Sequence, residues 1–578
     1  MHQAQIACAW MLVMYKAYTF LLVFMLILTP GISLHASPTQ PAQITCQELK
    51  QHASQGMDFA ISAQICSLVE TGRLEELHWP DCSSYRAQVE QFYLFSRYAP
   101  AWTRQGRPTQ QANAMIELFR TAEKKGLEPE DYDASRWTAR LEALAREEQH
   151  AEDLARFDFA LTVSAFRYTS DLYHGRVSPT ECQANLPQKQ FDAAQFLRAE
   201  IIQASNVTAA VQKMDPPFEG YRRALAALEH YRAVERQGDA LPLPAMKSSL
   251  HPGEQFSGIQ QLTERLRQLG DLPANASAPT SQLYQEPLVT AVKLFQERHG
   301  LRGDGVIGHV TFEELGVPVS RRITQIKLAL ERWRWLPRNL GPRVLVVNIP
   351  EFRLRAYDDH RLTLIMRAIV GEAPEHQTPI FADGMQSIVF RPYWNVPESI
   401  QKKELVPLLR RNPAYLIKHR MELVDAKGGV VTASARDKKV LARLASGELH
   451  IRQQPGPANS LGLIKFVFPN QFGVYVHGTP EPELFYQARR DFSHGCIRIE
   501  NPAALAGWVL RDRPEWTEQR ILSTMRGDKS VTVKVTAPIP VLILYGTALV
   551  EENGEVHFFR DIYGNDASLE RALATPRH

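Results

Sequence analysis

Hydrophobic positions follow a helical repeat through the first part of the chain. Residues 111–125 show this spacing and end at Gly126, and a glycine at this place is typical of a helix C-terminus. Residues 151–173 repeat the pattern, and one predicted helix face carries Leu154, Phe157, Leu161, Ala165 and Tyr168. The pattern predicts a mostly helical domain over residues 37–250, with these aromatic side chains in its core.

A second helical unit follows a stretch that is rich in proline and glycine. Residues 240–256 are interpreted as a linker because they contain Pro242, Pro244, Pro252 and Gly253. Beyond the linker, residues 256–318 hold short amphipathic segments separated by glycine-containing turns, at Leu262–Gly270, Leu288–Gly300 and Thr311–Leu315. This pattern predicts a compact module of three short helices.

From Arg343 onward the hydrophobic period changes from that of a helix to that of a strand. Short apolar runs typical of strands occur at Val344–Ile349, Phe352–Tyr357, Ser387–Phe390, Ile464–Phe468, Val474–Val476 and Val531–Val535. Asn553 and Gly554 lie between two further runs, 542–549 and 556–559, and this dipeptide is a strong hairpin signal. The C-terminal part is therefore predicted to be β-rich.

A helical stretch interrupts this β-rich part. Between Pro397 and Arg452 the apolar residues return to helical spacing, at Leu405, Leu408, Leu409, Val440, Leu441 and Leu444. An insertion of this kind is often a lid that closes over a substrate. The alternative is a surface insertion without a functional role.

The N-terminus has the pattern of an export signal. Lys16 precedes an apolar run over residues 17–28, which ends at Pro30 and Gly31. The run is shorter than the roughly 20 apolar residues of a membrane-spanning helix, although the residues before Lys16 are also apolar. Residues 1–36 are therefore predicted to be a secretory signal peptide or a membrane anchor, which places the protein in the periplasm, either free after cleavage or anchored to the inner membrane.

The cysteines fit an exported protein. One of the six, Cys8, lies in the predicted signal, and Cys496 stands alone near the C-terminal end. The other four precede residue 200 and allow up to two disulfides in an oxidising compartment, with three possible pairings of Cys46, Cys66, Cys82 and Cys182. No Cys-x-x-Cys spacing indicates a zinc site.

Composition narrows the class of partner. The chain has 578 residues, enough for three or four domains, and its formal net charge is only +3. It contains no block of lysines and arginines, so a nucleic-acid partner is not expected.

The strongest chemical signal is a cysteine with two nearby histidines. The segment Val-His-Gly-Thr at residues 476–479 precedes Phe-Ser-His-Gly-Cys-Ile-Arg at residues 492–498. A thiol becomes a strong nucleophile when an imidazole takes its proton. An isolated His–Cys pair is usually coincidence, but the complete pattern is much rarer by chance.

This pattern resembles the signature of the L,D-transpeptidases, the cysteine enzymes that cross-link peptidoglycan. Segments 98–102, 126–132, 171–176, 393–397, 452–457, 461–466 and 561–564 resemble the large periplasmic Gram-negative subtype, and residues 256–318 resemble a peptidoglycan-binding module. The resemblance implies a multidomain α+β protein. Its parts are a helical N-terminal scaffold, the small helical module, and a β-sandwich-like catalytic domain over residues 340–564 with a capping insertion over residues 398–450. Residues 565–578 are expected to form a flexible tail.

The resemblance also assigns roles to residues of the pattern. Cys496 is expected to be the nucleophile and His477 the general base, although His494 lies nearer in sequence. Ser493, His494 and Gly495 are expected to form the oxyanion loop. Arg498 is expected to pair with a substrate carboxylate.

Weaker candidates for the substrate groove are Arg452, Trp394 and Tyr486. Asp491 is not favoured as a third catalytic member, because a backbone carbonyl can orient the base instead.

The implied reaction is transfer of a stem peptide through a thioester at Cys496, with release of D-alanine and formation of a 3→3 cross-link between peptidoglycan stem peptides. Carbapenems are expected to acylate the same cysteine. No metal or organic cofactor is implied, because the chain has no His-x-x-x-His helix and no glycine-rich phosphate loop. The alternatives are an L,D-carboxypeptidase, a non-catalytic peptidoglycan-binding scaffold and a sortase-like transpeptidase. Acceptor preference is left open.

Overall fold

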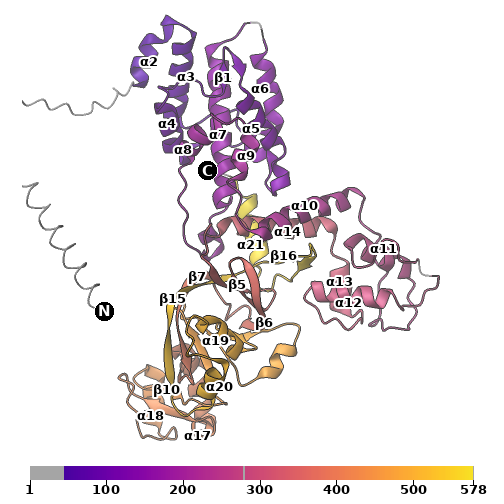
Figure 1. Cartoon of the computed structure of the whole chain (residues 1–578), viewed down its shortest axis with the longest axis vertical. Coiled ribbons are helices and arrows are strands. Elements are labelled where there is room, and N and C mark those ends of the chain that lie inside the picture. Colours follow the sequence, from indigo (N-terminus) through magenta and orange to yellow (C-terminus); the bar gives the residue numbers. More distant parts are fainter. Residues whose placement is uncertain (1–44, 147, 278–279, 577–578) are drawn as a thin grey trace, which may run out of the picture.

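The computed structural model describes residues 45–146, 148–277 and 280–576. A helical domain lies at one end of the molecule and a β-rich domain at the other, and a small helical module projects sideways between them (Figure 1). The predicted export signal over residues 1–36 lies outside the described ranges. Within those ranges no helix is long and apolar enough to cross a membrane.

The N-terminal domain packs short helices around one long central helix, α7. All but one of the positions between Ala155 and Thr169 on this helix are buried, because it is surrounded by its neighbours. The helices of this domain are α2 (Cys46–His52), α3 (Met57–Thr71), α4 (Arg86–Leu94), α5 (Gln110–Arg120), α6 (Trp137–Leu144), α7 (Ala151–His174), α8 (Ala193–Phe196) and α9 (Val207–Gln212). The two periodic segments of the sequence correspond to α5 and α7, and Gly126 adopts the left-handed conformation at φ 72°.

One disulfide forms among the four N-terminal cysteines. Cys46 and Cys66 join α2 to α3, whereas Cys82 and Cys182 are free thiols. The Cys82 thiol is buried and donates to the Gly72 carbonyl at 2.9 Å. Four cysteines therefore yield one bridge rather than the two that the count allows.

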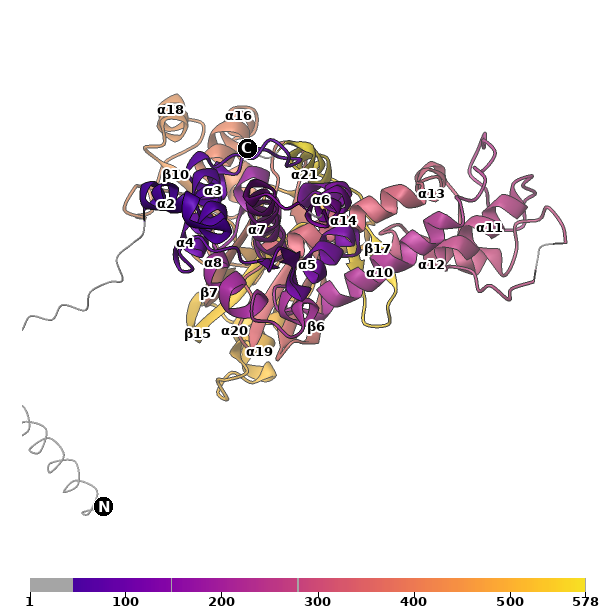
Figure 2. The ribbon, with the colours of Figure 1, turned by 90° about the horizontal axis from the view of Figure 1, so that it is seen from above.

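The module lies between two long helices that also pack on each other. These are α10 (Glu219–Arg236) and α14 (Val319–Trp335), and the module itself consists of α11 (Ile259–Leu269), α12 (Leu288–Arg298) and α13 (His309–Leu315). Seen from above, the module extends far to one side of the rest of the molecule (Figure 2). Its buried residues nevertheless belong to the same continuous apolar core as the large sheet of the β-rich domain. The module is thus fixed to the β-rich domain by packing.

The β-rich domain is a mixed sheet that closes on itself. Its ten strands run in the order β11-β12-β14-β6-β5-β4-β15-β7-β3, with β13 beside β6, and β11 also pairs with β7. The strands are β3 (Ala184–Asn185), β4 (Arg343–Asn348), β5 (Arg353–Asp358), β6 (Arg361–Gly371), β7 (Ile380–Phe390), β11 (Ile464–Val467), β12 (Val476–His477), β13 (Asp491–Ser493), β14 (Ile497–Ile499) and β15 (Val531–Leu544). β3 comes from the N-terminal part of the chain and adds a parallel strand to β7. Helices α19 (Pro502–Leu510) and α20 (Glu518–Arg526) lie between β14 and β15.

The insertion within this domain has a core of its own. It is not purely helical, because β8 (Trp394–Asn395), β10 (His450–Gln453) and β9 (Met421–Val424) form a three-stranded antiparallel sheet. Helices α15 (Glu398–Ile400), α16 (Val406–Arg411), α17 (Tyr415–Lys418) and α18 (Lys438–Ser446) and a π-helical turn (Gln401–Leu405) complete it. Leu409, Leu444 and Ile451 are fully buried at its centre.

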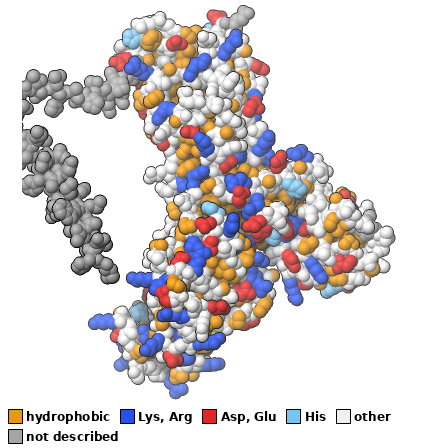
Figure 3. All heavy atoms as spheres, viewed as in Figure 1, with side chains coloured by type: hydrophobic (Ala, Val, Ile, Leu, Met, Phe, Trp, Pro, Cys, Tyr) orange, Lys and Arg blue, Asp and Glu red, His pale blue; other side chains and the backbone are white. Residues whose placement is uncertain are grey.

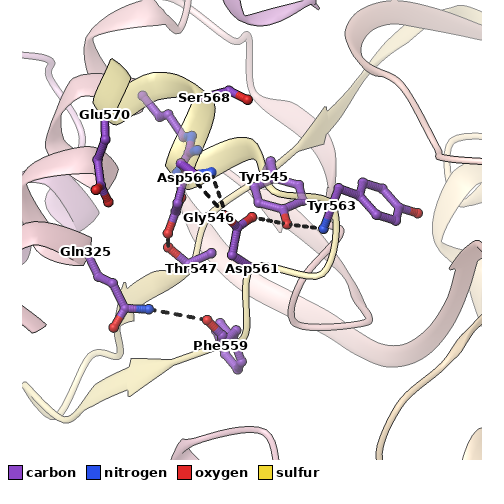
Figure 4. Close-up of polar contacts among 12 residues, drawn as sticks. Gln325, Tyr545, Gly546, Thr547, Phe559, Asp561, Tyr563, Asp566, Ser568 and Glu570 are labelled. Atoms are coloured by element: carbon purple, nitrogen blue, oxygen red, sulfur yellow. Dashed lines mark hydrogen bonds and ion pairs between the residues drawn. The ribbon is translucent and has the colours of Figure 1, made fainter. Parts of the chain in front are cut away.

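The expectation of a flexible C-terminal tail is wrong. The predicted hairpin at Asn553 and Gly554 is β16 (Ala548–Val550) with β17 (Val556–Phe558), and residues after it form α21 (Asn565–Ala574). Asp566 is buried and accepts a hydrogen bond from Thr547 (Figure 4). It also accepts a hydrogen bond from Arg332, and Leu569 is buried as well. Because Asp566 and Leu569 are both buried, this short helix packs against the rest of the protein.

Candidate active site

Three neighbouring strands place the charged and titratable residues of the site on one face. Lys465 of β11 pairs with His477 of β12, and His477 pairs with Arg498 of β14. Residues that pair directly across strands project from the same face of a sheet. The next row, Phe466, Val476 and Ile497, is fully buried on the opposite face. The strand register therefore builds a row of Lys465, His477 and Arg498.

Cys496 lies one position before β14, on the same face as this row. The Ile497 N–H donates to the Tyr475 carbonyl at 3.0 Å, which places Cys496 beside Tyr475. Because β12 and β14 are parallel, Cys496 and His477 are diagonal neighbours, at a spacing of roughly 7–8 Å between backbones that side chains can bridge. The two residues that the sequence predicts as nucleophile and base thus share one surface.

His477 is held in one tautomer by a backbone carbonyl. Its Nδ1 lies 2.6 Å from the Gly478 carbonyl oxygen, which can only accept, so Nδ1 carries the proton and Nε2 is the basic nitrogen. Burial, together with the positive charge of Arg498, lowers the pKa of His477 to about 3. Asp491, a carboxylate five residues before Cys496, instead forms a two-pronged ion pair with Arg489.

Tyr475 lies beside the sulfur of Cys496. Hydrogen bonding by the Tyr475 backbone N–H and phenol lowers the pKa of the Cys496 thiol, and hydrogen bonding by Trp394 lowers the pKa of the Tyr475 phenol. The Cys496 Sγ also lies 3.9 Å from the Gly473 carbonyl oxygen. The Lys465 ammonium lies 3.7 Å from the centre of the Tyr475 ring. Burial raises the pKa of the half-buried Cys496 thiol, whereas the Tyr475 hydrogen bonds and the Lys465 charge oppose that rise.

Sequence reasoning missed Tyr475 and Lys465. The sequence did contain a signal for Tyr475. Side chains alternate between the two faces of a strand, so Tyr475, two residues before His477, lies on the same face as His477. Lys465 gave no local signal, since only the pairing of β11 with β12 brings it to the site.

These pKa directions favour a neutral thiol and a neutral imidazole in the free protein. The sequence instead predicted a thiolate kept by His477. A raised thiol pKa and a lowered imidazole pKa both disfavour the charged pair. Proton transfer from sulfur to imidazole is therefore expected to accompany attack on the substrate rather than to precede it.

The pH dependence of acylation follows from these shifts. Because His477 takes the thiol proton during the attack, we expect the rate at which Cys496 reacts with a carbapenem to change little between about pH 4 and 8, and to rise only above about 8.5, the ordinary thiol pKa, where thiolate begins to form. No acid limb from His477 is expected until the pH approaches about 3, the lowered pKa of its imidazole. Stopped-flow rates over a pH series check this, and a steady rise between about pH 4 and 8 would show that His477 does not take the thiol proton during the attack.

The loop before Cys496 is fixed by hydrogen bonds to distant residues. Thr378 Oγ1 donates to the Gly495 carbonyl and accepts from the Gly371 N–H, both at 2.8 Å. Gly495 has φ +102°, which favours glycine, and a Cβ at Gly371 would lie 1.8 Å from the His376 carbonyl oxygen. Thr378, another residue that sequence reasoning missed, therefore fixes the position of the loop that carries Cys496.

The C-terminal segment supports Thr378 from behind. The Tyr563 phenol hydrogen-bonds to the Gly371 carbonyl and accepts from the Thr378 N–H at 3.2 Å. The Tyr545 hydroxyl accepts from the Tyr563 N–H and donates to Asp561 (Figure 4). This arrangement gives a structural reason for the segment 561–564 that the sequence singled out.

The three residues expected in the oxyanion loop have different environments. Ser493 Oγ donates to the Cys496 carbonyl at 2.5 Å and accepts from the Gly495 N–H at 3.2 Å. The Gly495 amide is thus already occupied. The exposed His494 ring contacts Glu404 of the insertion at 2.9 Å through Nε2. The insertion therefore contacts the loop that carries Cys496, through Glu404 and His494.

Arg498 has an internal partner. It donates to Glu481 at 2.8 Å, and its side chain is 18% exposed. A substrate carboxylate that binds Arg498 must therefore share the guanidinium group with Glu481 or displace Glu481 from it.

The weaker candidates divide between the groove and the surface. Trp394 reaches the site through Tyr475, as described above. Arg452 pairs with Glu422 and stacks on Tyr393. Tyr486 is 78% exposed and lies near Arg367.

We expect Tyr475→Phe to slow acylation of Cys496 by about tenfold, since one hydrogen bond to a charged sulfur contributes roughly 1.5 kcal/mol. The ring remains, so stability should change little. Tyr486→Phe, at an exposed tyrosine, is the matched control. Equal acylation rates for the two variants would show that the Tyr475 phenol does not contribute to the reaction.

Comparison with known proteins places families on three parts of the chain. Residues 342–536 match the L,D-transpeptidase catalytic domain, residues 257–315 the "Putative peptidoglycan binding domain" and residues 87–228 the "Scaffold domain". A "Putative L,D-transpeptidase" of Haemophilus influenzae is 31% identical over 278 residues, which are 47% of this chain and 55% of the relative. The chain thus spans about half the length of this curated relative.

Solved structures also match. The L,D-transpeptidase of Xylanimonas cellulosilytica is 17% identical and covers 52% of this chain and 100% of its own, with a TM-score of 0.16. L,D-transpeptidase 1 of Mycobacterium tuberculosis is 13% identical and covers 35% of this chain and 61% of its own, with a TM-score of 0.13. TM-scores this low do not establish a common arrangement over the whole chain.

Proposed function

We propose that this chain, which carries an L,D-transpeptidase catalytic domain and a peptidoglycan-binding-type module, cross-links peptidoglycan through a thioester on Cys496. The observation that supports this most is the shared face of Cys496, Tyr475 and the row Lys465, His477, Arg498. It combines a nucleophile, a neutral base and cations in one place, as acyl transfer requires.

The proposed reaction has two steps. Cys496 Sγ attacks the carbonyl of the L-to-D bond in a tetrapeptide stem and His477 Nε2 takes the thiol proton. A carbon–sulfur bond forms, the amide bond breaks, and the proton passes from His477 to the leaving D-alanine nitrogen. In the second step the side-chain amine of a diaminopimelate attacks the thioester, loses a proton, and releases the thiol as the 3→3 amide bond forms.

Two features of the site support the positions of these groups. The Gly478 carbonyl holds the imidazole with the proton on Nδ1, which leaves Nε2 as the basic nitrogen, and the Thr378–Gly495 hydrogen bond fixes the turn that carries the sulfur. Arg498 and Lys465 supply positive charge for a carboxylate of the stem, with Glu481 as the internal competitor. The insertion is proposed as a lid because Glu404 contacts His494.

The substrate implies where the protein works. Peptidoglycan lies outside the cytoplasmic membrane, so we propose a periplasmic location that follows export by residues 1–36. The Cys46–Cys66 disulfide supports an oxidising compartment. Carbapenems are proposed as inhibitors that acylate Cys496.

Incubation of the full chain with purified disaccharide-tetrapeptide, followed by mass spectrometry, tests the function. Cross-linked dimers that have lost one D-alanine are the expected product. Tripeptide monomers without dimers would instead indicate an L,D-carboxypeptidase, with water as the acceptor. An unchanged substrate, together with no adduct on Cys496, would leave only the non-catalytic scaffold.

A further inference from the structure

A cleft that is separate from the site around Cys496 lies where the module meets the catalytic domain. It has a volume of about 660 Å³, within the range of ligand sites. Its walls come from the α12–α13 region, the turn after β4, the loop before β13 and the segment after β17, and the residues used below are His299, Arg302, Phe352, Arg489, Phe559 and Arg560. In Figure 3 the module projects from the body of the molecule and leaves a re-entrant surface between the two.

The two walls of the cleft are fixed relative to each other. Arg298, at the end of α12, forms a buried ion pair with Asp271 inside the module and donates to the Val556 carbonyl of the catalytic domain at 3.0 Å. Gln325 of α14 reaches the Phe559 carbonyl at 3.4 Å (Figure 4). Because buried polar contacts and a shared apolar core join the walls, the cleft is preformed.

Two cations of the cleft, Arg302 and Arg560, have free hydrogen-bonding capacity, whereas its carboxylates already accept hydrogen bonds. Asp561 accepts from the Tyr545 hydroxyl and from two backbone N–H groups, and Asp304 accepts from the Val306 N–H and from Gln296. Within the described ranges the guanidinium groups of Arg302 and Arg560 make no hydrogen bond. Their nearest carboxylates lie at 3.7 Å and 3.9 Å, and their side chains are 84% and 55% exposed.

A buried histidine adds an unused acceptor. His299 lines the cleft and is 1% exposed, and its Nδ1 bonds to the Phe295 carbonyl at 2.7 Å, so Nε2 is the acceptor. That Nε2 has no hydrogen-bond partner among the described residues. A buried polar atom without a partner is costly, and a donor on a ligand would relieve the cost.

We propose that this cleft binds a carboxylate-bearing sugar–peptide segment of the peptidoglycan strand, at a distance from the segment that reacts at Cys496. Arg302 and Arg560 bind the carboxylates. His299 Nε2 accepts from a hydroxyl or amide N–H, and Phe352 and Phe559 contact apolar faces. This inference rests on the proposed function, since it names a second contact with the same polymer.

The cleft is connected to the catalytic machinery along the chain. Ala488 and Arg489 line it, and the chain then passes through β13 directly to Cys496. β13 in turn pairs with the end of β6 at Gly371, the residue that Thr378 holds. A strand bound in the cleft is therefore anchored on the same domain as the nucleophile, which would favour substrates longer than one disaccharide.

The test compares R302Q/R560Q with the matched control R107Q/R236Q, which removes the same charge from exposed arginines outside the cleft. Full-length proteins are sedimented with purified sacculi at several salt concentrations. We expect the cleft variant to bind at least about tenfold more weakly than the control, with a smaller salt dependence, because two charge-assisted contacts are lost. Equal binding by the two variants would overturn the proposal.

Two further measurements separate this inference from the proposed function. The rate of Cys496 acylation by a carbapenem should be within about twofold of wild type in the cleft variant, because a small acylating agent does not need the cleft. His299→Phe keeps the ring stack on Phe295 and should weaken sacculus binding without changing its salt dependence. A protein that binds sacculi through the cleft but never forms an acyl-enzyme would refute the proposed function without refuting the proposed binding cleft.

Discussion

Replacing Cys496 by alanine is expected to abolish both the covalent carbapenem adduct and all product from tetrapeptide substrates. The thiol is the only group on the proposed catalytic face that can form a thioester, so the loss should be at least about 10⁴-fold, as for other enzymes that lose a nucleophile. Its side chain is half-buried and removal of one sulfur should cost little stability, which thermal unfolding checks.

Cys182→Ala is the matched control for this variant, because Cys182 is the other half-buried free thiol of the described residues. Intact mass spectrometry after incubation with a carbapenem should show one adduct on wild type and on Cys182→Ala, and none on Cys496→Ala. An adduct that persists on Cys496→Ala would place the nucleophile elsewhere and refute the mechanism.

His477→Gln is expected to lower the acylation rate by about 10²- to 10⁴-fold, which is the range for loss of a general base. Glutamine retains hydrogen-bonding capacity toward the Gly478 carbonyl but offers no basic nitrogen. Because the resting thiol is neutral, its proton needs an acceptor as the sulfur attacks, and the remaining rate should become proportional to hydroxide concentration.

His494→Gln is the control for this second variant, because His494 is the rival base in the sequence. Its Nε2 contacts Glu404 and its side chain is exposed, so a loss below about tenfold is expected. Rates measured across a pH series distinguish the two histidines. A larger loss in His494→Gln than in His477→Gln would reverse the assignment of the base.

Local patterns in the sequence were sufficient to predict several elements. The helical repeat predicted α5 and α7, and the apolar runs predicted β4, β5, β11 and the hairpin β16–β17. The segment around Cys496 was identifiable because its chemistry and its turn are both encoded within a few residues. Such features depend on neighbours along the chain, which a sequence displays directly.

The residues that complete the site come from non-local pairing. Lys465 reaches His477 only because β11 and β12 pair in one register, and a shift of one residue would turn it to the buried face. Thr378 and Tyr563 reach the nucleophile loop from elements more than sixty residues away on either side. No local pattern carries such information.

The sequence by itself therefore determined the helical and β-rich regions, the nucleophile candidate and the family that it resembles. The tertiary structure decided which side chains surround the sulfur, which of four cysteines pair, that the module shares the catalytic core, and that residues 565–574 form a docked helix. The physical reason is the range of the interactions. Helix periodicity and turn chemistry act over a few residues, whereas strand register, burial and the pKa of a buried imidazole are set by contacts between distant segments.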